Sequence, residues 1–110
     1  MHKKIMDLID SRGSVSFVEL DNEINGFSGG DLNLLYPHKK NVFIWFGMTE
    51  EGLEAIKKIL EPKDSKYCLK PTIALTYVID GKTPQTPLAK QARNYKTPHW
   101  LPMVFDKLNH

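Results

Sequence analysis

The chain has 110 residues, of which 41% are apolar and 25% are charged. This size and composition predict one globular domain, residues 1–110, with a core that needs neither disulfide nor metal. No apolar run reaches the ~18 residues of a membrane helix, and the N-terminus lacks the apolar segment of a secretory signal. With its lone Cys68, which suits a reducing compartment, the chain is expected to be cytoplasmic and to have no membrane partner.

The net charge of +2 is unevenly distributed along the chain. Residues 1–62 carry seven basic and ten acidic side chains, whereas residues 63–110 carry eight basic and three acidic ones. This distribution indicates a polarised surface. The alternative is a basic C-terminal tail that is merely solvated.

Two short helices are predicted near the N-terminus. Residues 2–12 place apolar side chains three and four positions apart, as a helix with one buried face requires. Residues 17–24 predict a second helix, with Ser16 as its N-cap and Glu19 three residues later completing a capping box. The residues between the two helices alternate polar and apolar and are expected to form a short strand.

A two-stranded ribbon is predicted next. Residues 25–31 are rich in glycine and predict a loop. Residues 32–36 fit a strand or a short helix, of which the strand is preferred. Residues 42–46 predict a strand that is apolar on both faces, which is typical of a central strand. Residues 37–40 would join them as a hairpin loop, so the antiparallel ribbon would carry a basic tip.

The clearest helix in the sequence follows this ribbon and ends near Leu60. Thr49 is suited to cap its N-terminus, where acidic residues come first, and Pro62 lies just beyond its end. Gly52 is the weak point, since glycine inside a helix costs roughly 1 kcal/mol relative to alanine.

The last 48 residues are predicted to form strands and extended segments. Residues 66–69 and 71–79 favour strands, and Asp80-Gly81 is a strong hairpin signal. The return arm, residues 82–89, contains two prolines and would be an edge strand or extended segment. An apolar end near residues 98–105 would pack back onto the core as a final strand or strap.

The order of helices, strand and ribbon over residues 2–61 resembles that of a winged-helix domain. The resemblance implies an α+β fold with a winged-helix-like part, residues 1–62, of three helices and a two-stranded ribbon. A β-hairpin and a basic, aromatic strap, residues 63–110, would pack on it. A winged helix has a third, recognition helix before the wing. Here only Gly26–Tyr36 could hold it, and that segment has three glycines and no basic residue.

Three phrases resemble a second group of proteins: N-V-F-I-W-F-G-M-T-E-E, L-T-Y-V-I-D-G-K and Y-K-T-P-H-W-L-P. They look like those of small uncharacterised proteins from bacterial and phage or mobile-element genomes. The resemblance implies a similar origin and no particular activity.

The best functional candidate is the tract K-Q-A-R-N-Y-K-T-P-H-W near the C-terminus. Cations can neutralise phosphates, and aromatic faces can stack on bases. Two alternatives remain open: the aromatic rings could anchor the tail in the core, or the tract could contact a protein. The predicted nucleic-acid contacts are Lys90, Arg93, Tyr95, Lys96, His99 and Trp100, together with Lys39 and Lys40 at the ribbon tip.

The sequence offers no pattern typical of a metal site or a catalytic nucleophile. Its four histidines and one cysteine lack the short spacings of metal ligands, and no serine lies in a G-x-S-x-G turn. The acidic residues fit solvated helix faces. We therefore expect no metal, no cofactor and no enzymatic activity.

These observations predict a small nucleic-acid-associated or regulatory protein that contacts the DNA or RNA backbone. The alternative is a protein-interaction module, for example a homodimer in which the apolar segment Trp100–Phe105 completes another chain's sheet.

Overall fold

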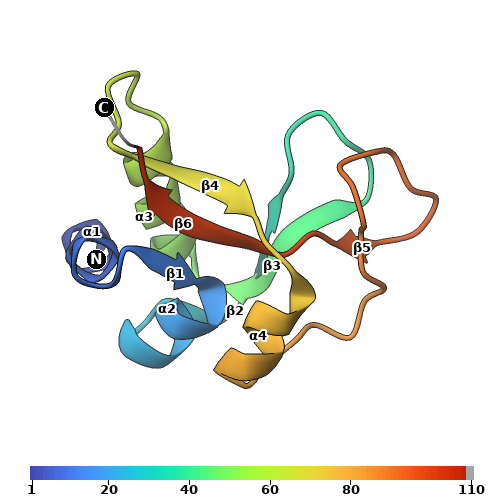
Figure 1. The fold of residues 1–110 in the computed structure, drawn as a ribbon, viewed down its shortest axis with the longest axis horizontal. Helices are drawn as coiled ribbons and strands as arrows, with labels where there is room; N and C mark the ends of the chain where they lie inside the picture. The colour runs from blue at the N-terminus through green and yellow to red at the C-terminus, as the bar shows by residue number, and fades with distance from the viewer. Residues whose placement is uncertain (109–110) are drawn as a thin grey trace.

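Four helices and six strands form an α+β fold in the computed structural model, which describes residues 1–108 (Figure 1). The described residues make one compact body with a radius of gyration of 13.3 Å. In chain order the elements are α1 (His2–Arg12), β1 (Ser14–Ser16), α2 (Phe17–Glu23), β2 (Ser28–Leu35), β3 (Val42–Met48), α3 (Glu50–Leu60), β4 (Tyr67–Pro71), α4 (Ala74–Asp80), β5 (His99–Trp100) and β6 (Met103–Lys107).

The strands form two small sheets, which Figure 1 shows toward the left and the right of the molecule. One sheet has the order β1-β6-β4 with antiparallel pairs, and the other has the order β2-β3-β5, in which β5 runs parallel to β3. One continuous core connects them. Phe17 is central to it, because its ring packs 5.5 Å from that of Phe105 and 6.0 Å from that of Trp45, between centroids.

The capping signals of the first half are confirmed. The Ser16 hydroxyl accepts from the Glu19 amide at 3.2 Å, and the Glu19 carboxylate accepts from the Ser16 amide at 3.3 Å. The Thr49 hydroxyl likewise accepts from the Gly52 amide at 3.0 Å, and α3 begins at Glu50 as expected. Local side-chain chemistry therefore fixed where these helices start.

The ribbon is confirmed, but its first strand is longer than predicted. β2 begins at Ser28, so part of the predicted loop at residues 25–31 is strand. The pairing with β3 is interrupted by bulges, because Ser28 and Leu32 both lie opposite Met48. Gly26–Tyr36 contains no recognition helix, and the winged-helix layout is not confirmed. β3 is the central strand of its sheet, as predicted.

The predicted hairpin at Asp80-Gly81 is wrong, and so is the strand before it. Residues 74–80 form α4, and Gly81 ends that helix with φ 102°, a left-handed conformation. Tyr77 explains the difference. Its fully buried ring packs 4.9 Å from that of Trp100, and its hydroxyl donates to the Met103 carbonyl at 2.5 Å and accepts from the Phe17 amide at 3.2 Å. These long-range contacts outweigh the strand preference of the β-branched residues.

The C-terminal segment is an integral part of the core. It forms β5 in one sheet and β6 in the other, where β6 pairs with a strand along each edge. Trp100 and Phe105 are buried. β6 already pairs with a strand along each of its edges within the chain, and the expected dimer through Trp100–Phe105 stays a prediction.

None of the helices between residues 1 and 108 has the length and apolar character needed to cross a membrane.

Candidate functional site

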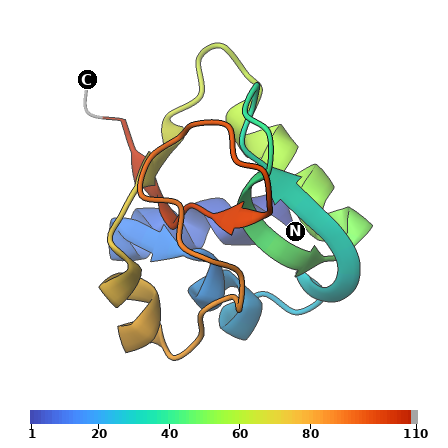
Figure 2. The same cartoon turned by 90° about the vertical axis from the view of Figure 1, so that its right-hand side faces the viewer.

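Backbone hydrogen bonds join two basic loops that are 50 residues or more apart in sequence, at the right-hand end of Figure 1. One is the β2–β3 turn, residues 37–41, and the other is the loop at residues 91–98; together we call them the basic end. The Tyr95 amide donates to the Lys40 carbonyl at 3.1 Å, and the His99 amide donates to the Asn41 carbonyl at 2.8 Å. Figure 2, which faces this end, shows the later loop in front. The fold thus brings the two predicted basic segments together.

Asparagine side chains add further links across this junction. The Lys40 amide donates to Asn94 Oδ1 at 2.8 Å, and Asn41 Nδ2 donates to the Tyr95 carbonyl at 3.0 Å. Asn41 has φ 59°, and asparagine tolerates this left-handed conformation better than most residues do. Sequence reasoning missed both asparagines as positioning residues. The only available signal was the preference of asparagine for turns.

Tyr95 holds the second loop in shape. Its hydroxyl donates to the Gln91 carbonyl at 3.0 Å, and its ring stacks on that of His99 with centroids 3.9 Å apart and planes 16° apart. The Arg93 guanidinium carbon lies 5.0 Å from the centroid of the same ring. Because these neighbours already occupy the half-buried ring, Tyr95 is better placed to organise the loop than to stack on a base.

The basic end carries positive charge with no carboxylate to balance it. Lys39, Lys40, Arg93 and Lys96 are exposed, and none forms an ion pair with another residue of the described part of the chain. Residues 32–49 and 81–105 contain no Asp or Glu at all. Four cations with no ion-pair partner among residues 1–108, carried on two linked loops, create a local positive field suited to phosphate oxygens.

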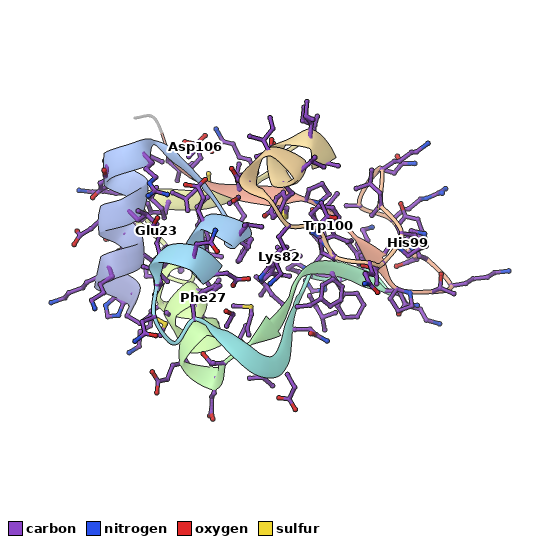
Figure 3. All side chains as sticks on the ribbon, turned by 90° about the horizontal axis from the view of Figure 1, so that it is seen from below. Glu23, Phe27, Lys82, His99, Trp100 and Asp106 are labelled. Carbon is purple, nitrogen blue, oxygen red and sulfur yellow. The ribbon has the colours of Figure 1, made fainter. Side chains whose placement is uncertain are left out.

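Three predicted contact residues lie outside the basic end: His99, which directly follows its second loop in β5, Trp100 and Lys90. Trp100 is 3% exposed and packs edge-on against Tyr77, so its ring presents no face to a base. Figure 3 shows it well inside the molecule, whereas His99 lies nearer the end. Lys90 is exposed but borders a groove beside the start of α4. The structure thus places Trp100 in the core and Lys90 at the border of this groove.

A second cluster of charge lies at Asp21, whose side chain is 7% exposed. Its carboxylate accepts from Lys82 Nζ at 3.3 Å and from Trp45 Nε1 at 3.4 Å. Burial raises the pKa of Asp21 even though Lys82 and both hydrogen bonds lower it. Asp21 therefore holds Lys82 over the core, with its Nζ 5.9 Å from the centre of the Trp45 ring.

Within residues 1–108, no group of three or more His, Cys, Asp or Glu side chains is placed to hold a metal ion. No protein-family model, curated protein or solved structure matches the chain. The resemblances to winged-helix domains and to bacterial or phage proteins therefore stay predictions.

Proposed function

We propose that the chain is a non-enzymatic, nucleic-acid-associated protein that contacts the phosphate backbone through its basic end. The proposal rests on one observation: direct hydrogen bonds join two loops that carry no carboxylate and four cations, none of which forms an ion pair within the described part of the chain. Either loop alone would be only a short run of basic residues exposed to solvent. The hydrogen bond between the backbone groups of Lys40 and Tyr95 brings the two loops, and with them their charges, into one region of the molecule.

The arrangement favours backbone contact over sequence reading. Phosphate contacts position a protein on nucleic acid, whereas base-edge contacts specify sequence. The cations lie on loops, and the rings of Tyr95 and His99 stack on each other instead of offering a free face to a base. The β2–β3 turn would act like the tip of a wing, which is the part of the winged-helix likeness that this proposal keeps. A cytoplasmic location and a bacterial, phage or mobile-element origin belong to it as expectations.

Titration of fluorescent duplex and single-stranded DNA over a range of salt concentrations tests the proposal. Four phosphate contacts predict a slope of log K against log salt of about −3.6 for duplex and about −2.8 for a single strand. The variant Lys39→Gln/Lys40→Gln should bind both DNAs more weakly at about 50 mM salt. It should make the slope less steep by about 1.8 for duplex and about 1.4 for single-stranded DNA.

Lys57 and Lys58 supply the matched control. They are also adjacent and exposed, but they lie on α3. The variant Lys57→Gln/Lys58→Gln removes the same net charge and should leave the slope unchanged. Absence of binding by the wild type at about 50 mM salt, or equal losses in the two variants, would contradict the proposal.

A further inference from the structure

A pocket of about 310 Å³ is formed by the same two stretches of the chain that form the basic end. Its walls are the later part of β3, residues 45–47, and the segment that follows α4, from Lys82 to Thr86. The basic end uses the turn before β3 and the loop at residues 91–98. The pocket and the basic end therefore both belong to residues 32–49 and 81–105, the two stretches that contain no Asp or Glu.

Strand β3 leads from the basic end to this pocket. It starts at Val42, directly after the basic turn, and Val42 pairs with His99. Lys82 Nζ lies 5.9 Å from the centre of the Trp45 ring, three residues further along the strand. Those three residues span roughly 10 Å of backbone. Figure 3 shows Lys82 between Phe27 and His99. One short strand of nucleic acid is therefore long enough to contact both the basic end and the pocket.

Phe46 contributes an aromatic ring to the wall of the pocket. The ring is half-buried and stacks on the half-buried ring of Phe43, with centroids 5.0 Å apart and planes 18° apart. Residues three apart on a regular strand face opposite sides. A bulge brings these two together, because Trp45 lies opposite Leu34 and Phe43 lies opposite Leu35. The irregular pairing of β3 thus creates a pair of stacked rings at the pocket.

The charges at the pocket also suit a polyanion. Lys82 donates to Asp21, but an ammonium group has three N–H donors, and this side chain is 62% exposed. Its other donors remain available to a ligand. The Asp21 carboxylate is 7% exposed and is paired with Lys82, so it offers little negative charge to the surface. A phosphate at the basic end and a base in the pocket would therefore meet no uncompensated carboxylate from either stretch.

We propose that the pocket takes one base of a single-stranded nucleic acid whose phosphates contact the basic end. This inference rests on the proposed function and narrows its ligand to single strands. The pocket volume is at the lower end for small-molecule sites, which suits one flat base. The base would stack against Phe46 and accept from Lys82. The bases of a duplex are paired and stacked, so they would have to flip out before they could enter.

Fluorescence anisotropy at about 50 mM salt tests this inference with two labelled strands of about 12 nucleotides. One is a thymidine oligonucleotide, and the other is an abasic strand with the same number of phosphates. The wild type should bind the thymidine strand at least fivefold more tightly, because only that strand has bases to stack. Phe46→Leu should remove this preference and leave the affinity for the abasic strand unchanged. Phe46→Tyr keeps the aromatic face and should retain the preference.

Tyr67→Leu is the matched control, since Tyr67 is also half-buried but lies on β4 in the other sheet. It should keep the preference for the thymidine strand, and circular dichroism should show that all three variants are folded. Equal affinity of the wild type for the two strands overturns this inference and leaves the proposed function standing. A preference that survives Phe46→Leu does the same. Absence of binding to both strands overturns both proposals.

Discussion

Tyr77 shows how one side chain can decide the conformation of its neighbours. Its hydroxyl bonds two backbone groups from distant parts of the chain, the Phe17 amide and the Met103 carbonyl. Burial of the ring raises the pKa of Tyr77, so the hydroxyl stays neutral and can donate. Trp100 packs against the same ring, and its Nε1 is buried without a hydrogen-bond partner among the described residues. Both residues serve the core.

Asp21 gives a residue-level prediction about pH. Burial raises the pKa of Asp21 in the folded state above its value in the unfolded chain. The folded protein therefore binds a proton at the Asp21 carboxylate more tightly than the unfolded chain does. The contribution of Asp21 to stability is therefore most favourable below the unfolded pKa and is lost as pH rises through the folded pKa. Asp21→Asn should increase the free energy of unfolding relative to wild type at about pH 7, and the gain should shrink toward about pH 3.

Urea unfolding of both proteins at several pH values measures this difference. Asn can still accept from Trp45 Nε1, so the substitution mainly removes the charge and its ion pair with Lys82. Asp31→Asn, at an exposed position, is the control and should produce a smaller effect. A loss of stability in Asp21→Asn that grows from pH 3 to pH 7 would mean that the ion pair outweighs the burial of the carboxylate.

At the scale of elements, Gly52 tests helix preference against packing. Alanine at this position in α3 should gain roughly 1 kcal/mol from helix propensity. An added Cβ, however, would lie 2.5 Å from the Phe27 carbonyl oxygen, which accepts from the Thr49 amide that opens the helix. We expect packing to win, so that Gly52→Ala lowers the free energy of unfolding by about 1 to 3 kcal/mol.

Thermal unfolding measures this change as a drop in Tm. Lys58→Ala, at an exposed position of the same helix, is the control and should leave Tm nearly unchanged. A rise in Tm for Gly52→Ala would show that the segment at Phe27 moves aside easily and that helix preference decides.

The elements that the sequence predicts well are those set by local chemistry. Both capped helices and the ribbon depend on residues a few positions apart, such as Ser16 and Glu19. Helix α4 could not be predicted in this way, because contacts of Tyr77 with residues 26 and 60 positions away hold it. Gly81 of the predicted hairpin does adopt a positive φ, but it ends helix α4 instead of forming a hairpin turn. The basic end shows the same dependence on long-range contacts. The sequence predicted its cations, but it did not predict Asn41 and Asn94, whose hydrogen bonds join the two loops.

The whole molecule is organised around its C-terminal segment as much as around β3 and α3. In the described chain, β1 and β4 each pair only with β6, and β5 adds to the edge of β3. Segments from both ends of the chain thus meet in one core. The fold therefore has to close long loops before most of its buried contacts form.

This topology predicts that truncation after Pro98 unfolds the entire chain. The truncation removes β6 and with it every pairing of β1 and β4, along with the buried side chains of Trp100 and Phe105. Each large core side chain is worth about 2 to 5 kcal/mol, and a domain has only about 5 to 15 kcal/mol in total. Circular dichroism and amide NMR dispersion should therefore both collapse.

The control for this truncation is an insertion of two glycines after Lys63. The surrounding residues 61–64 are exposed and lie outside every helix and strand, so the insertion lengthens a loop at little cost. The insertion variant should keep its amide dispersion and its cooperative melting. A truncated chain that retains dispersed resonances for α1, α2 and α3 would contradict the single-core description, because it would show that the N-terminal part folds without the strand that joins β1 to β4.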